Sequence, residues 1–238
     1  MGKNEDNLIF GRNPVKEAIK SNSVISIIIS DSFKDGDVLK LISESSLPVK
    51  RVHQNELNKM CPGVNQGIAA VVKSYGYHSL EEILHKAKKE ERPIIVMLDG
   101  IVDPHNFGAI LRCCDIFGVV GVIISKHHQV PLNATVAKTS AGAINFVPVV
   151  AVSNLNNAIK TLKEAGFWIV ASSGNAKMNY QELKYDFPTV LVIGNEGDGI
   201  SQLVIKNSDY LVKIPMYGKV NSLNASVATG VLLSRIKG

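Results

Sequence analysis

The sequence has no apolar run long enough to cross a membrane. Its longest apolar stretches, residues 24–29 and 119–124, fall far short of the roughly 20 residues that a membrane-spanning helix needs. The opening residues, MGKNEDN, are polar and contain no hydrophobic signal region. We therefore expect a soluble, cytoplasmic protein.

Cysteine is scarce. The three cysteines include the adjacent pair Cys113 and Cys114, and no CxxC or Cys/His spacing suggests a zinc site. An odd number of cysteines does not make a disulfide framework. The sequence therefore predicts neither structural disulfides nor a bound metal.

Aromatic residues are few, at 6%, and there is no run of basic residues or aromatic RNA-recognition signature. The 26 Lys and Arg against 21 Asp and Glu nevertheless give a net charge of +5. That charge suits a polyanionic partner, and it equally suits a basic enzyme that meets no nucleic acid. With 45% hydrophobic residues in 238 positions, a disordered chain is excluded.

Two phosphate-binding fingerprints are also missing. Neither the GxGxxG of dinucleotide-binding folds nor the GxxxxGK[ST] of P-loop proteins occurs in the sequence. A conventional dinucleotide or nucleoside triphosphate site is therefore disfavoured.

What is present is an alternation of strand and helix signals. Residues 1–74 read as a small α/β domain, residues 75–92 as a partly helical linker opened by a Ser79–Glu82 capping box, and residues 93–238 as a second α/β domain. In the second domain the strands are apolar with little alternation, which indicates a parallel sheet covered on both faces. Ligands of such sheets bind beyond the carboxyl ends of the strands. The loops after Met97, Ile193 and Ile214 are therefore the candidate site.

The first of these loops contains two polar candidates. Asn106 is expected to open a helix, as a cap or as a functional residue. Arg112 lies six residues on in an otherwise apolar run, where a guanidinium needs a carboxylate, a phosphate or a route to water. A structural salt bridge is the simpler alternative for this arginine.

The other two loops add three more candidates. Glu196 stands among glycines directly after a strand. It is interpreted as a functional carboxylate, as a partner of Arg112 or as a charge that caps the next helix electrostatically. Ser222 and Asn224 precede a final helix rich in small residues. The simplest role for either of them, or for Asn221, is to cap that helix.

Taken together, DPHNFGAILR, VIGNEGDGIS and IPMYGKVNSLNASVATG resemble the three ordered motifs of the SpoU/TrmH family of SPOUT ribose 2'-O-methyltransferases, over residues 93–238. The pieces GRNPVKEAI and NQGIAAVV resemble the ribosomal-protein-like substrate-binding domain of the RlmB branch, which methylates guanosine in 23S ribosomal RNA.

The resemblance implies a knotted α/β catalytic domain and a homodimer whose active site is completed across the interface. It also implies S-adenosylmethionine as cofactor, held by loop residues that include Gly194, Ile214, Met216 and Leu223. Of the catalytic residues, Arg112 would contact the 2'-OH and an adjacent phosphate, and Asn106 and Glu196 would orient Arg112 and the substrate. Ser222 and Asn224 would shape the cofactor loop and bind ribose or phosphate.

Methyl transfer to a hydroxyl needs positioning and removal of a proton but no metal, which agrees with the missing metal-ligand spacing. The alternatives are a tRNA guanosine 2'-O-methyltransferase, an enzyme for adenosine or another ribosomal position, and an RNA-binding module that has lost activity.

Overall fold

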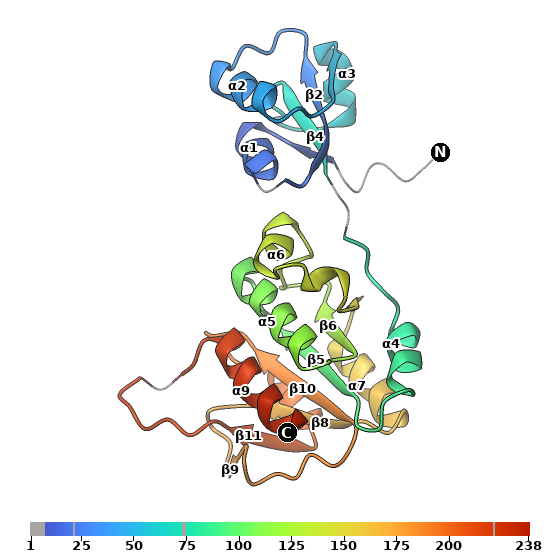
Figure 1. Cartoon of the computed structure of the whole chain (residues 1–238), viewed down its shortest axis with the longest axis vertical. Coiled ribbons are helices and arrows are strands. Elements are labelled where there is room, and N and C mark those ends of the chain that lie inside the picture. Colours follow the sequence, from blue (N-terminus) through green and yellow to red (C-terminus); the bar gives the residue numbers. More distant parts are fainter. Residues whose placement is uncertain (1–7, 21, 73–74, 221) are drawn as a thin grey trace. The chain divides into compact units, whose positions relative to one another are not determined.

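The computed structural model describes residues 8–20, 22–72, 75–220 and 222–238. The chain divides into two compact units, Met1–Tyr75 and Gly76–Gly238 (Figure 1). Each unit has its own sheet and its own hydrophobic cores.

The first unit is built on a mixed four-stranded sheet in the order β1-β4-β2-β3. Strand β4 (Ile68–Val72) pairs antiparallel with both β1 (Leu8–Phe10) and β2 (Val24–Ser30), and β2 pairs parallel with β3 (Val49–Val52). The small N-terminal α/β domain predicted from the sequence is confirmed.

Helices cover both faces of this small sheet. Val15 of α1 (Arg12–Lys20) and Val38 of α2 (Gly36–Glu44) share one core with β2, whereas Leu57 of α3 (Gln54–Met60) lies in a second core. The helix α2 begins after Asp35, whose side chain accepts a hydrogen bond from the backbone N–H of Val38.

The second unit is built on a seven-stranded sheet in the order β7-β6-β5-β10-β8-β11-β9, and every pair of neighbours is parallel. The predicted parallel sheet is therefore confirmed, while the predicted knot stays a prediction. In chain order the strands are β5 (Ile94–Asp99), β6 (Gly121–Ser125), β7 (Val149–Val152), β8 (Trp168–Ser172), β9 (Met178–Asn179), β10 (Thr189–Gly194) and β11 (Tyr210–Lys213).

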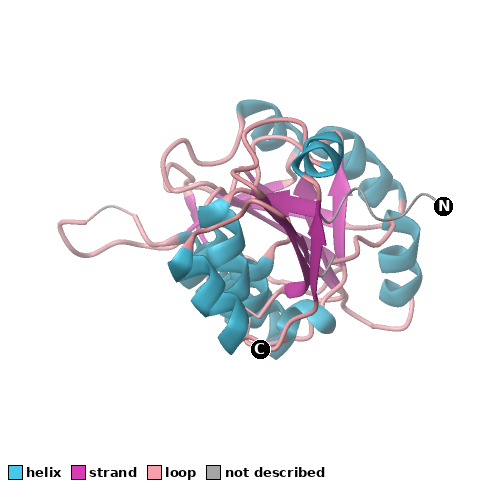
Figure 2. Ribbon diagram, turned by 90° about the horizontal axis from the view of Figure 1, so that it is seen from above, coloured by secondary structure: helices cyan, strands magenta, loops and turns pink. Residues whose placement is uncertain are grey.

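Alternate residues of the central strand β5 enter two cores, so helices lie on both sides of the sheet (Figure 2). Val96 packs on the face covered by α5 (Pro104–Ile116), α6 (Ala134–Thr139), the short 3-10 helix Ala143–Asn145 and α9 (Ala225–Lys237). Met97 packs on the opposite face, which α4 (Leu80–Ala87), α7 (Leu155–Glu164) and α8 (Gln202–Asn207) cover.

The stretch 75–92, predicted as a linker, contributes α4 to the second unit. The predicted capping box is present, with hydrogen bonds between Ser79 and Glu82 in both directions. Ile83 and Ala87 are buried one turn apart, and a Cβ added to Gly121 would lie 2.1 Å from Ile83 Cδ1. The burial of Ile83 and Ala87 thus suffices to pack α4 against the second unit, although the sequence of this helix has only a partial apolar face.

Two short strands, β1 and β9, are not predicted by the sequence, because three or two residues carry no readable alternation. Where the structure describes the chain, no helix is both long and apolar enough to cross a membrane.

Candidate functional site

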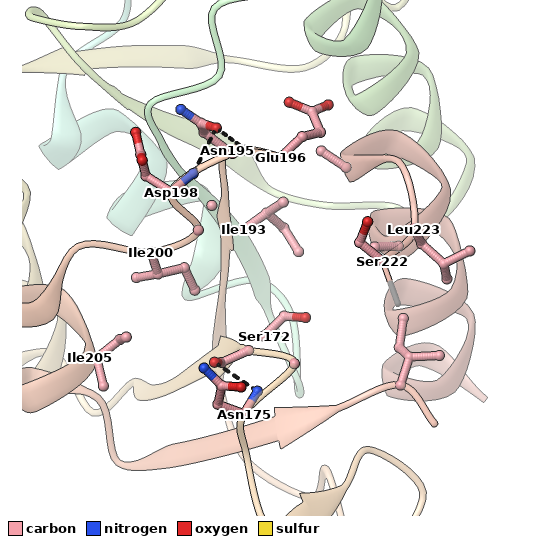
Figure 3. A pocket seen from close by; sticks show the side chains of 18 of the residues that line it. Ser172, Asn175, Ile193, Asn195, Glu196, Asp198, Ile200, Ile205, Ser222 and Leu223 are labelled. Atoms are coloured by element: carbon pink, nitrogen blue, oxygen red, sulfur yellow. Dashed lines mark hydrogen bonds between the residues drawn. The ribbon is translucent and has the colours of Figure 1, made fainter. Parts of the chain in front are cut away.

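A cavity of about 330 Å³ lies at the carboxyl ends of β8, β10 and β11 (Figure 3). It is the edge of the sheet at which a parallel α/β fold binds ligands. The four residues predicted to hold a cofactor, Gly194, Ile214, Met216 and Leu223, all line it, and Glu196 and Ser222 line it as well. The segments 172–175 and 193–200 supply most of the remaining wall.

The loop after β10 is closed on itself by Asn195. Its side-chain oxygen accepts hydrogen bonds from the backbone N–H of Gly197 (2.5 Å) and of Asp198 (3.3 Å), and its backbone exchanges two bonds with Gly199. A Cβ on Gly194 would lie 2.3 Å from the carbonyl carbon of Gly199, so only glycine permits this close approach. The glycines therefore bring backbone, rather than side chains, to this part of the cavity wall.

Three candidate residues from three motifs meet beside the cavity. The amide nitrogen of Asn106 donates a short hydrogen bond to Glu196, and the amide oxygen of Asn106 accepts one from Asn224 Nδ2 at 2.8 Å. Both polar ends of Asn106 are thus engaged. This hydrogen-bond network joins residues up to 118 positions apart in the sequence, and it fixes the Glu196 carboxylate beside the cavity.

Asn224, in turn, caps the last helix. Its side-chain oxygen accepts hydrogen bonds from the backbone N–H of Ser226 (2.9 Å) and Val227 (3.4 Å). The predicted capping role therefore belongs to Asn224 rather than to Ser222, which is exposed and lines the cavity. Asn221, the other predicted cap, lies outside the described residues.

Asn106 does not open its helix, in contrast to the prediction. The helix α5 begins two residues earlier, since the Asp103 side chain accepts a hydrogen bond from the backbone N–H of His105 and Pro104 occupies the first helical position. As the third residue of α5, Asn106 has its side chain free to reach Glu196.

Arg112 is exposed, and among the described residues it makes neither an ion pair nor a hydrogen bond. The predicted salt bridge and the predicted pairing with Glu196 are therefore absent from the described part of the chain. The reason is helical geometry: six residues from Asn106 rotate a side chain about 120° around the helix, away from the face that Asn106 uses. Arg112 reaches water, which was the third sequence-based option.

Cys113, the neighbour of Arg112, faces α9 instead. Its sulfur lies 4.0 Å from the Ser226 carbonyl oxygen, and burial raises the pKa of the thiol although the Arg112 charge lowers it. The thiol therefore stays protonated at neutral pH, which fits a packing role.

Sequence reasoning missed two parts of the site, the residue Asn195 and the segment 172–175 after β8. The second was within reach, because the apolar run WIVAS is typical of a buried parallel strand, and the carboxyl end of such a strand lies on the same edge of the sheet as the others. Asn195 gave no separate signal, since an asparagine between glycines is typical of any turn.

We expect the replacement Asn106→Asp to lower turnover by about 10- to 100-fold, which corresponds to the roughly 1.5–3 kcal/mol of a hydrogen bond to a charged group. The new carboxylate keeps the acceptor for Asn224 but repels Glu196 instead of donating to it. Steady-state kcat measures the effect, with thermal unfolding to verify the fold. The pair Asn106→Asp/Glu196→Gln restores a donor and an acceptor, and turnover of the single variant equal to wild type would contradict the positioning role.

Two family models match the chain, and together they span nearly all of the described residues. The SpoU rRNA Methylase family model matches residues 93–234, and a model described as RNA 2'-O ribose methyltransferase substrate binding matches residues 8–78.

Known proteins resemble the chain over two thirds or nearly all of its length. A Staphylococcus epidermidis protein assigned to the TrmH family of tRNA/rRNA methyltransferases is 44% identical over 237 residues, which are 98% of this chain and 95% of that protein. The SpoU methyltransferase AviRb from Streptomyces viridochromogenes, solved in complex with the cofactor AdoMet, superposes with a TM-score of 0.62 at 22% identity over 96% of this chain and 88% of that one. An A. aeolicus TrmH/SpoU tRNA modifying enzyme gives a TM-score of 0.57 at 35% identity, over 66% of this chain and 79% of that one.

Proposed function

The chain belongs to the SpoU rRNA methylase family of RNA 2'-O-ribose methyltransferases, and from this premise we propose that it methylates the 2'-OH of a guanosine in 23S ribosomal RNA with S-adenosylmethionine. The observation that carries the proposal is the convergence of the three motifs. Their predicted cofactor residues line one cavity, and Asn106, Glu196 and Asn224 form one hydrogen-bonded network beside it.

The cavity fits an S-adenosylmethionine molecule in its chemistry. Ile193, Ile214 and Leu223 offer apolar surface to the adenine, and the glycine loop offers peptide groups for the polar parts. Glu196 and Asp198 lie at the same wall, where their charge suits the positive sulfonium and ammonium groups. AviRb, which shares the fold, binds AdoMet in its solved complex.

When bound, S-adenosylmethionine supplies an electrophilic methyl group. The residues of this chain then have to align the ribose hydroxyl for in-line attack and stabilise the negative charge that develops on its oxygen as the proton passes to water. Asn106 and Asn224 hold Glu196 in place, and Ser222 offers a hydroxyl at the cavity wall. A guanidinium, which stays charged at neutral pH, stabilises the developing alkoxide and the adjacent phosphate.

We assign this guanidinium role to Arg112, which would act on the active site of the other protomer in a homodimer. Within one protomer the arginine points about 120° away from Asn106 and is exposed. A second copy packed against α5 and α9 would bring Arg112 of one protomer to the cavity of the other. Ile116 and Val227, on these same two helices, are 67% and 50% exposed, which suits such an interface.

A tRNA substrate is the second candidate. The A. aeolicus tRNA modifying enzyme is 35% identical, but the match covers only 66% of this chain. The additional match to a substrate-binding model over residues 8–78 favours an RNA that engages a separate domain. This N-terminal domain is the reason for preferring ribosomal RNA.

The proposal is tested by incubating the purified protein and labelled S-adenosylmethionine with unmodified 23S ribosomal RNA or with bulk tRNA. Mapping of ribose methylation in the labelled RNA identifies the nucleotide. We expect one guanosine 2'-O in 23S ribosomal RNA. Label in tRNA alone would keep the reaction and overturn the substrate, and label at adenosine would overturn the nucleoside.

The absence of label in both RNAs would overturn naked RNA as substrate, and ribosomal particles would then be assayed. A failure to bind S-adenosylmethionine, measured by calorimetry, would overturn the enzyme itself and favour an inactive RNA-binding module.

A further inference from the structure

A loop of three consecutive cationic or titratable side chains follows β6 at the same edge of the sheet as the cavity. It comprises Lys126, His127 and His128, all of them exposed. We refer to residues 126–128 as the Lys-His-His loop. None of these three side chains has a role in the proposed methyl transfer.

Hydrogen bonds of the two residues that follow this loop connect it to the segment that leads into the first motif. Ile101, in the loop between β5 and α5, donates its backbone N–H to Gln129 Oε1 at 2.8 Å and accepts a hydrogen bond from Val130 N at 2.9 Å. On the other side, Lys126 N donates to the Val152 carbonyl oxygen at 2.8 Å. The loop is therefore held in place beside the segment that carries Asn106.

The three side chains have no anionic partner within the described part of the chain, where no ion pair or side-chain hydrogen bond involves them. Neighbouring carboxylates on the edge are already engaged: Asp99 accepts from Ser201 N at 2.8 Å and Glu196 accepts from Asn106. Lys126 therefore places at the β6 end of the edge a positive charge that forms no ion pair in the described part of the chain.

We propose that the Lys-His-His loop binds the phosphate backbone of the RNA next to the ribose that is methylated. This inference rests on the proposed function and adds to it a contact on the catalytic domain itself. A lysine ammonium is a point charge that binds phosphate, and imidazole N–H groups donate hydrogen bonds to phosphate oxygens.

The strand order gives the distance between the cavity and the Lys-His-His loop, which the RNA has to span. The β10 end, with the cavity and Glu196, and the β6 end are separated only by β5, so they lie two strand spacings, or about 10 Å, apart. An RNA strand with its ribose at the cavity mouth and lying across the edge toward β6 would bring a neighbouring phosphate onto the loop. The loop would therefore set the orientation of the strand rather than its sequence.

The test compares the full-length chain with the triple variant Lys126→Ala/His127→Ala/His128→Ala. Binding of unmodified 23S ribosomal RNA and of bulk tRNA is measured by filter binding over a range of salt concentrations, alongside methylation kinetics. We expect RNA affinity to fall at least about fivefold and the slope of log K against log salt to become shallower by about 1. S-adenosylmethionine affinity and thermal stability should match wild type.

The matched control is Lys88→Ala/Lys89→Ala, which removes two exposed charges after α4, at the amino end of the sheet. It should leave RNA binding unchanged. The charge reversal Lys126→Glu provides a second variant with an effect larger than that of alanine at this position.

Unchanged RNA affinity and salt slope in the triple variant, with wild type active, would overturn this inference and leave the methyltransferase intact. An equal loss in the control pair would overturn it too, because binding would then depend on net charge alone. If the wild-type chain bound neither RNA, the inference and the proposed substrate would fail together.

Discussion

Replacement of Arg112 with alanine is expected to abolish methyl transfer while S-adenosylmethionine binds as in wild type. The reason is that the guanidinium is assigned to the developing negative charge and the phosphate, not to the cofactor cavity, whose lining does not include Arg112. Removal of one preorganised donor to such a charge costs about 100- to 1,000-fold in kcat. Single-turnover methylation measures the loss, and calorimetry measures cofactor affinity.

The controls separate this role from a general loss of charge. Arg92, exposed at the amino end of β5, supplies the matched variant Arg92→Ala, which should keep full turnover. The variant Arg112→Lys keeps the charge but loses the planar fork, so we expect an intermediate rate. Near-normal turnover in Arg112→Ala would contradict the assignment.

Mixed dimers test whether the arginine acts on the other protomer. Refolded mixtures of Arg112→Ala with Glu196→Ala contain about one half heterodimers, and in each heterodimer one of two sites would combine an intact cavity with an intact arginine. We therefore expect recovery of about a quarter of wild-type activity. If Arg112 acted on its own protomer, both sites would stay defective and the mixture would stay inactive.

Whether a strand or helix of this fold can be predicted depends on its length and on how clear its pattern of apolar residues is. The β5 run IIVMLD and the β10 run TVLVIG are apolar enough to predict buried parallel strands, and both form as expected. The strands β1 and β9 are not predicted because segments of three and two residues carry no readable alternation. The start of α5 was misplaced because Asp103-Pro104 competes with Asn106 as a start signal, and proline at the first helical position decides.

The sequence predicts which residues belong to the site, but it does not predict how their side chains are arranged. The motif resemblance named Asn106, Glu196 and Asn224, but only the fold shows that one asparagine bridges the other two. The direction of Arg112 could have been anticipated, because six residues along a helix do not return a side chain to the same face. The role of Asn195 could not, since it depends on how close the loop returns to Gly194.

The second large effect is expected at Gly194, where alanine should destroy the cofactor cavity. The added Cβ would lie 2.3 Å from the carbonyl carbon of Gly199, 2.5 Å from its oxygen and 2.5 Å from the nitrogen of Ile200. All three atoms belong to the backbone, so no side-chain rotation relieves the clash. The loop that Asn195 closes has to move, and overpacking of this kind costs about 1–3 kcal/mol.

That displacement removes the peptide groups that face the cavity. We expect S-adenosylmethionine affinity to fall about 10- to 100-fold, since every 1.4 kcal/mol is a factor of ten, and turnover at subsaturating cofactor to fall with it. Isothermal titration calorimetry measures the affinity, and circular dichroism at rising temperature separates a local change from global unfolding.

Gly174→Ala is the matched control, because Gly174 lines the same cavity but has no atom within 4 Å of an added Cβ. It should bind the cofactor nearly as wild type does. If both variants lost binding equally, the cause would be any added bulk in the cavity, and the argument from close backbone approach would be wrong. If Gly194→Ala bound normally, the loop would be able to open without loss of the site, and the backbone of residues 194–199 would not be the cofactor-holding wall.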